Sequence, residues 1–350
     1  QSASYELYRR LIGEAIDSDE GLTELIIIPH GELNLLPWAA LQTEAGDKES
    51  DGRSLPYLIK TYAIQVESSV NVFYQEAFER TLTATNYAYA GFAPSYGGEL
   101  LSSRKLADST SLYRAFPKFY RQMVGSLRFN KEEVEEVAGF FSGGKYEIGE
   151  GATETNFKEI SGQSSILHVA SHGVSSRYNP ALSHLIFSDP RSDDEDDGLL
   201  YAWEVYGMQL PADLTVLSAC GSGAGAVRTG TSTMSLARAF KYAGSRDVLM
   251  SLWPVDDLST FQLMRYFFQS LKEEMPKGKA LQSAMLQHLT SEKNAEFTHP
   301  YFWSGFSMVG PGLPLVEGQA GFWKKYWWSF LIGLGILALL WLGRRSKVRE

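Results

Sequence analysis

Short apolar runs that alternate with helical patterns constrain the fold of this 350-residue chain more than any other feature. Runs rich in β-branched residues are typical of buried strands, and a 3.6-residue apolar period is typical of amphipathic helices. The predicted strands are 22–29, 62–67, 86–93, 165–171, 184–189, 214–219 and 247–253. The predicted helices are 5–16, 69–82, 131–142, 231–244, 257–274 and 277–290. This alternation predicts an α/β fold with a mostly parallel central sheet covered by helices on both faces.

Two of the predicted central strands end in residues that can do chemistry. SILHVASHG (165–173) ends in His172 and Gly173, and LTVLSACGSG (214–223) contains Cys220, the single cysteine of the chain. The carboxyl ends of parallel strands meet at one rim of an open sheet, and ligands bind at that rim. We therefore expect the imidazole and the thiol to lie near each other.

A thiol beside an imidazole is the arrangement of a nucleophilic cysteine. A free thiol has a pKa of about 8.5, and a neighbouring imidazole accepts its proton or stabilises the thiolate. The main-chain N–H groups of Gly173 and Cys220 are candidates for an oxyanion hole, in which each donor contributes roughly 3 kcal/mol. The alternative is a structural role, because a lone cysteine is more often a small buried hydrophobe. The spacing alone leaves both interpretations open.

Three further patterns do not predict a metal or nucleotide site. His168 and His172 have the spacing of a zinc-binding helix, but they lie in a predicted strand with no glutamate between them. The glycines of GSGAG (221–225) lack the lysine of a phosphate loop. The acidic run DDEDD (193–197) lacks the ligand spacing of a calcium loop, so we expect an exposed, solvated loop. No metal and no cofactor are predicted.

The charge balance and the cysteine count limit the partners and the compartment. The formal net charge is -9, and no basic patch interleaves with aromatic residues until the last residues of the chain, which argues against nucleic acid as a direct partner. One cysteine cannot form an internal disulfide, so a reducing compartment is favoured. The chain begins at Gln1 without a secretory leader, and we expect it to be a piece of a longer protein.

The C-terminal region has the pattern of a membrane anchor. Residues 326–343 carry no charge, have tryptophans at both ends, and lie between Lys324, Lys325 and a basic tail at 344–350. Such a segment predicts a transmembrane helix, since a buried core helix is rarely apolar all round. The heavier basic tail would place the globular part outside, but the missing export signal and the free thiol favour a catalytic domain that faces the cytoplasm.

Five segments, in order along the chain, resemble the CHAT domain. They are LIIIPHGELNLLPWAAL (25–41), ILHVASHG (166–173), DLTVLSACGSG (213–223), SLARAFKYAGSRDVLMSLWPVDD (235–257) and HPYFWSGFSMVG (299–310). CHAT proteins belong to the caspase–separase group of cysteine peptidases and share a caspase-like α/β/α sandwich with a His-Gly then Cys dyad. The matching positions here are His172, Gly173 and Cys220, and none departs from the pattern.

The resemblance implies a cysteine endopeptidase in which Cys220 attacks the scissile carbonyl and His172 protonates the leaving amine. It also implies a division of the chain into a non-catalytic caspase-like half (1–125), a catalytic half (126–312), a linker (313–325), the anchor (326–343) and the tail (344–350). Members of the family are commonly joined to tetratricopeptide repeats and act on dedicated partner proteins. The expected partners are thus a protein substrate, an upstream repeat region and the membrane.

The resemblance also implies a candidate specificity residue. SLWPVDD (251–257) is similar to a separase segment whose acidic residue meets a basic P1 side chain, so Asp257, or else Asp256, is a candidate for that role. The alternative is that one of the two aspartates caps the helix that begins there. Trp253 is a candidate lining residue of the same pocket, although an aromatic residue at a strand end is more often part of a core.

Two rival functions remain at this point. One is a catalytically silent caspase-like scaffold that docks partner proteins at the membrane. The other is a different thiol hydrolase, such as an acyltransferase, that uses the same dyad.

Overall fold

The computed structural model describes most of the chain up to residue 315. The described residues are 3–17, 21–45, 51–80, 85–96, 126–176, 179–188, 196–218 and 233–315. Cys220, the glycines 221–225, most of the predicted linker, the predicted transmembrane helix 326–343 and the tail lie outside them. Within the described ranges, none of the helices is long and apolar enough to cross a membrane.

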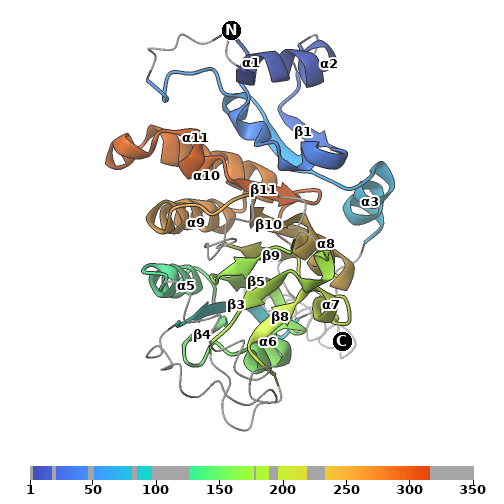
Figure 1. The fold of residues 1–350 in the computed structure, drawn as a ribbon, viewed down its shortest axis with the longest axis vertical. Helices are drawn as coiled ribbons and strands as arrows, with labels where there is room; N and C mark the ends of the chain where they lie inside the picture. The colour runs from blue at the N-terminus through green and yellow to red at the C-terminus, as the bar shows by residue number, and fades with distance from the viewer. Residues whose placement is uncertain are drawn as a thin grey trace, which may run out of the picture.

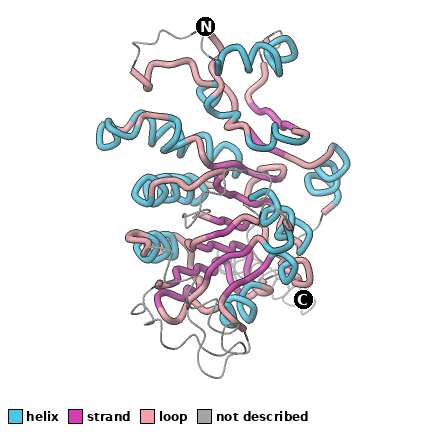
Figure 2. The backbone as a smooth tube through the Cα atoms, in the orientation of Figure 1, coloured by secondary structure: helices cyan, strands magenta, loops and turns pink. Residues whose placement is uncertain are grey.

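Eight strands form the central sheet, which is the layer of strands between helices in Figure 2. In spatial order they are β1 (Glu24–Ile27), β2 (Ala63–Val66), β11 (Phe306–Val309), β10 (Asp247–Ser251), β9 (Leu214–Leu217), β5 (Ser164–Val169), β3 (Tyr87–Pro94) and β4 (Lys145–Gly149). Every neighbouring pair is parallel except β10 and β11, which are antiparallel. The prediction of an α/β fold with a mostly parallel sheet is confirmed.

Helices cover both faces of this sheet, as Figure 1 shows for α5, α9 and α10 on one side and α6, α7 and α8 on the other. The α-helices are α1 (Ala3–Tyr8), α2 (Glu14–Ile16), α3 (Val70–Tyr74), α5 (Asn130–Ala138), α6 (Glu154–Ser161), α7 (Ala202–Val205), α8 (Thr233–Ala243), α9 (Asp257–Lys272), α10 (Lys277–Thr290) and α11 (Pro300–Trp303). Shorter 3-10 and π turns are Arg9–Gly13, Gly31–Leu35, Trp38–Ala40, Leu58–Lys60, Gln75–Glu79, Pro180–Leu182 and Glu292–Phe297.

The central strands are buried along almost their whole length because each face packs against a helical layer. Val216 belongs to the core under α9 and α10, whereas its neighbour Leu217 belongs to the core under α6 and α8. Successive side chains of a strand point to opposite faces, so a strand buried on both sides shows no polar alternation. This is why LTVL and DVLMS were recognisable as central strands.

The segment predicted as a strand at 184–189 does not join the central sheet. It forms β7 (His184–Ile186), the middle strand of a small antiparallel sheet with β6 (Gly173–Val174) and β8 (Leu199–Tyr201). Placing it among the parallel strands was wrong, because an apolar run by itself does not say which strand it pairs with.

Strands from both predicted halves of the domain share the one large sheet. From the first range, β1 and β2 lie at one edge, while β3 lies between β5 and β4 near the other edge. The predicted boundary near residue 125 lies outside the described residues, and the division into halves stays a prediction.

A buried ion cluster holds the amino ends of the central strands. The Nζ of Lys277 lies 2.8 Å from Asp213 Oδ1, just before β9, and 3.0 Å from Asp247 Oδ2, at the start of β10. The lysine is fully buried, and the Gly312 N–H donates to Asp247 Oδ1 at 2.7 Å. Buried charges persist only when paired and hydrogen-bonded. This end of the sheet is therefore structural, and the opposite rim carries the candidate site.

Candidate functional site at the carboxyl rim of the sheet

The register of β5 and β9 sets the ends of these two strands side by side, and a predicted catalytic position follows each strand in the sequence. Val169 pairs with Leu217, and the Ser218 N–H donates to the Val169 carbonyl at 3.2 Å. His172 follows Val169 by three residues, and Cys220 follows Leu217 by three residues. The predicted strand pair is thus adjacent and parallel. Cys220 itself lies outside the described residues, so its distance to His172 stays untested.

His172 lies where the chain leaves β5 and enters the small sheet. Its side chain is 2% exposed, and its carbonyl accepts a hydrogen bond from the Ile186 N–H at 2.8 Å. Its N–H donates to the Tyr96 hydroxyl at 3.0 Å, and the two rings lie 4.6 Å apart between centroids. The backbone and the ring of His172 are therefore both fixed by neighbours.

Gly173, the predicted oxyanion-hole residue, is the first residue of β6 and stands opposite Leu185. Because the preceding rung, His172 with Ile186, carries the ladder hydrogen bond, the Gly173 rung is a non-hydrogen-bonded one. The ladder therefore directs the Gly173 N–H away from β7. Its use as an oxyanion donor stays a prediction.

His168, which sequence spacing made a weak metal candidate, has a hydrogen-bonded structural place instead. The buried ring lies between the Tyr89 hydroxyl, 2.8 Å from Nδ1, and Glu133 Oε1, 2.8 Å from Nε2. Burial, with a smaller contribution from Glu133, raises the pKa of Tyr89 well above its ordinary value, so the phenol keeps its proton. It can donate to Nδ1, and the imidazole N–H on Nε2 can then donate to Glu133.

This buried network also reaches the end of β9. Ser218 Oγ lies 3.3 Å from His168 Nε2, and Ser218 comes two residues before Cys220 in the sequence. Glu133 lies on α5, Tyr89 on β3 and His168 on β5. The network thus ties one covering helix to three neighbouring strands directly below the rim.

Each of the three predicted substrate-binding residues makes a hydrogen bond within the fold. Asp256 is the N-cap of α9, and its carboxylate accepts from the Ser259 N–H at 3.0 Å. Trp253 Nε1 donates to the Tyr301 carbonyl at 3.0 Å. The capping alternative therefore describes Asp256, and neither contact tests a role in substrate binding.

Asp257 lies on the other side of the same turn. Its Oδ2 accepts from the N–H groups of Arg128, at 2.6 Å, and Phe129, at 3.1 Å, just before α5. Burial raises the pKa of the Asp257 carboxyl, while these two hydrogen bonds act in the opposite direction. The carboxylate joins the starts of α9 and α5, and its predicted meeting with a basic P1 side chain stays untested.

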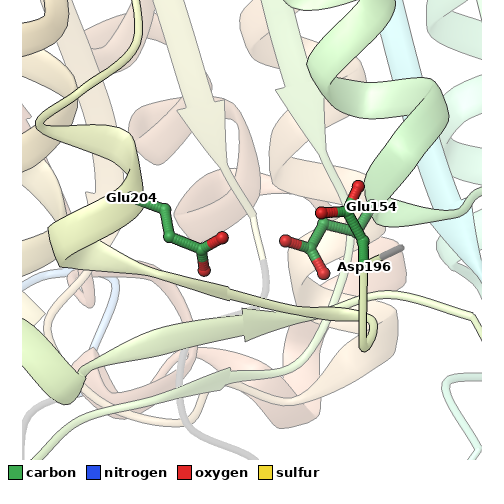
Figure 3. Close-up of side chains that lie close together, drawn as sticks. All are labelled: Glu154, Asp196 and Glu204. Carbon is green, nitrogen blue, oxygen red and sulfur yellow. The ribbon is translucent and has the colours of Figure 1, made fainter. Parts of the chain in front are cut away.

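Three carboxylates gather on Glu154, Asp196 and Glu204 (Figure 3). They could hold a cation, but the Nζ of Lys158 already lies 2.6 to 2.9 Å from an oxygen of each. Burial raises the pKa of Glu154 to about 7, and the neighbouring carboxylates add to that effect. The lysine supplies the positive charge that a metal would bring, so the cluster gives no reason to add one.

Asp196 belongs to the acidic run for which we expected only a solvated loop. Its carboxylate contacts Lys158 and accepts from Thr155 Oγ1 at 3.0 Å, so it ties the chain before β8 to α6. Residues 193–195 of the run lie outside the described residues.

Sequence reasoning missed Tyr96, Tyr89 and Glu133. Tyr96 stands two residues after β3, at the same rim as His172, so a polar aromatic residue just past a central strand was the available signal. Tyr89 and Glu133 gave no local signal, because their contacts with His168 span 79 and 35 residues.

Comparison with known proteins places the chain among characterised folds. A family model described as the CHAT domain matches residues 1–311. Tetratricopeptide repeat protein 28 of Homo sapiens is 26% identical over 322 residues, covering 83% of this chain and 12% of that protein. Its Mus musculus counterpart is 32% identical over 117 residues, covering 33% of this chain and 5% of that protein. The chain thus spans a small part of these relatives.

A solved structure shares the fold at low sequence identity. The Arg specific cysteine proteinase gingipain R aligns with a TM-score of 0.52 at 11% identity, covering 89% of this chain and 68% of that chain. At this identity the likeness concerns the architecture and not the activity.

Proposed function

Because this chain belongs to the CHAT domain family, we propose that it is a cysteine endopeptidase in which His172 and Cys220 cleave a specific partner protein. The observation that carries the proposal is the pairing of β5 with β9. Each candidate residue follows the last paired residue of its strand by three positions in the sequence, and open α/β sheets bind ligands at the rim where such strands end.

The proposed reaction is peptide hydrolysis through an acyl-enzyme. The Cys220 thiolate attacks the scissile carbonyl carbon, and the resulting oxyanion accepts hydrogen bonds from the N–H groups of Gly173 and Cys220. His172 gives a proton to the leaving amine as the C–N bond breaks. Water then attacks the thioester, His172 takes a proton from it, and the thiolate leaves.

The burial of His172 supports a latent form of this enzyme. With 2% of the side chain exposed, a substrate reaches the imidazole only after the segments around it move. We infer that a partner protein triggers this movement, which is a common control device for loops around an active site.

Two further proposals concern the segments on either side of the catalytic domain. Both curated relatives are named for tetratricopeptide repeats, and we propose that such repeats precede this domain in the full-length protein and bind its partner. We further propose that residues 326–343 anchor the protein to a membrane as a single span, with the catalytic domain facing the cytoplasm.

The first experiment compares cleavage with and without the thiol. The full chain, as wild type and as Cys220→Ala, is co-expressed with candidate partner proteins, and new protein termini are identified by mass spectrometry. Termini that require Cys220 support the endopeptidase. Equal partner binding by both forms without new termini favours the scaffold, and turnover of small thioesters without proteolysis favours the acyltransferase.

Specificity is tested on the same preparation. If Asp257 meets a basic P1 side chain, wild type prefers peptides with Arg over Leu at P1. Asp257→Asn should lose that preference while it keeps an oxygen that can accept from Arg128 and Phe129. Equal cleavage of both peptides by both forms would remove Asp257 from the pocket.

A further inference from the structure

We propose that Tyr96 is the residue that positions His172 for catalysis, an inference that rests on the proposed function. Tyr96 makes two different kinds of contact with His172, one to its backbone and one to its ring.

The first contact is an inserted rung in the small antiparallel sheet. The register that pairs Gly173 with Leu185 makes His172 and Ile186 the next pair. One ladder bond of that pair is present, from the Ile186 N–H to the His172 carbonyl. A regular pair would also have the reverse bond, from the His172 N–H to the Ile186 carbonyl.

The Tyr96 hydroxyl takes the place of that reverse bond. The His172 N–H donates to Tyr96 Oη at 3.0 Å, and Tyr96 Oη donates to the Ile186 carbonyl at 2.8 Å. One hydroxyl thus satisfies a donor and an acceptor that would otherwise bond each other. The direct bond from the Ile186 N–H to the His172 carbonyl remains on the other side of the rung.

The second contact sets the orientation of the imidazole. The Tyr96 and His172 rings lie 4.6 Å apart between centroids with 41° between their planes. An aromatic neighbour at this distance restricts the rotation of the side chain. Because the hydroxyl and the ring belong to one rigid phenol, a single residue fixes both the backbone and the side chain of His172.

Tyr96 can do this because its own place is fixed by β3. β3 is hydrogen-bonded on both sides, to β5 and β4. Ser95, which lies between the end of β3 and Tyr96, donates its N–H to Ser188 Oγ at 3.0 Å. Through Tyr96, the position of His172 is therefore fixed by a strand in the interior of the sheet.

The test uses the single cysteine as its reporter. Iodoacetamide alkylation of Cys220 is followed from pH 4 to 10 in wild type, His172→Ala, Tyr96→Phe and Tyr96→Leu. A thiol paired with an imidazole is alkylated at pH values below its ordinary pKa of about 8.5, which adds a shoulder on the acid side of the plot of rate against pH. We expect this shoulder in wild type but not in His172→Ala. Tyr96→Phe should lower the rate on the shoulder about tenfold, less than the roughly hundredfold loss that a 1 Å misplacement of a catalytic group can cause, because the ring contact remains. Tyr96→Leu, which also lacks the ring, should lower it further.

Tyr8→Phe is the matched control, because its hydroxyl bonds Asp17 within the N-terminal helical region, away from β5. It should keep the wild-type profile. An unchanged shoulder in Tyr96→Phe overturns the proposal, and so does an equal reduction in Tyr8→Phe.

A second measurement separates this inference from the proposed function. The ¹H–¹⁵N imidazole signals of His172, assigned by their loss in His172→Ala, are recorded in wild type and both Tyr96 variants. If wild-type Cys220 reacts as an ordinary thiol, the proposed function fails; shifted His172 signals in the Tyr96 variants would still support the positioning, and unshifted signals would overturn it.

Discussion

Gly91 in β3 offers a quantitative test of the network below the rim. A β-carbon at this position would lie 2.5 Å from Tyr89 Oη and 2.7 Å from Val134 Cγ1, closer than real contacts allow. Tyr89 therefore reaches His168 only because residue 91 has no side chain. Gly91→Ala should push the phenol off the imidazole.

The cost of this substitution has two parts. Inserting a methyl group into a packed core costs roughly 1 to 3 kcal/mol. Leaving a buried ring nitrogen without its hydrogen bond costs roughly 1 to 3 kcal/mol more. Gly91→Ala should therefore lower the free energy of unfolding by about 2 to 6 kcal/mol. At about 2 °C per kcal/mol for a chain of this size, the melting temperature should fall by about 4 to 12 °C.

Circular dichroism on heating measures the change for Gly91→Ala, Tyr89→Phe and the double variant. The double variant should lose less than the sum of the two single losses, because it lacks the hydroxyl that the methyl group displaces. Gly139→Ala is the control, since Gly139 ends α5 with a helical backbone at φ -64°. A Gly91→Ala protein that melts with wild type, or fully additive losses, would refute the reasoning.

Three further predictions concern buried titratable groups. Lys277→Met should lower the free energy of unfolding by about 3 to 5 kcal/mol, because two buried carboxylates lose their ammonium partner. The control Lys279→Met, at a more exposed lysine, should change it by less than about 0.5 kcal/mol. Equal melting temperatures of the two variants would contradict this prediction. Burial raises the pKa of Glu154 to about 7, so its contribution to stability is full at low pH and is lost as the pH rises from about 4.5 through 7. The melting temperature of Glu154→Gln should therefore rise relative to that of wild type between pH 5 and pH 8. A difference in melting temperature that does not change with pH would contradict the raised pKa. Burial lowers the pKa of His288 to about 4, so its contribution is full above pH 6.5 and is lost as the pH falls toward 4. His288→Gln should melt with a weaker dependence on acid than wild type, and an identical dependence would argue against a buried neutral imidazole.

The positions of individual central strands were readable from the sequence. The predicted runs 165–171, 214–219 and 247–253 overlap β5, β9 and β10 and differ from them by one or two residues at their ends. Their continuous apolar character is a local property, imposed by burial on both faces. Elements with weaker local patterns, such as β4, α6 and β11, were not predicted.

The order of the strands was not readable in the same way. β11 comes from the end of the described chain, yet it lies between β10 and β2 and runs antiparallel to β10. The apolar segment at 184–189 has a strand pattern, and only pairing with β6 and β8 puts it in the second sheet. Pairing is decided by packing between distant segments, which a local pattern does not record.

The sequence by itself determined the fold class, the CHAT family motifs and the two residues, His172 and Cys220, on which the proposed chemistry depends. These follow from short stretches whose composition and spacing carry the information. Only the tertiary structure decided that β5 and β9 are neighbours and that Tyr96, 76 residues before His172, holds its backbone and ring. Hydrogen bonds and ring contacts act over a few ångströms, so residues far apart in sequence acquire a joint role only when folding brings them together.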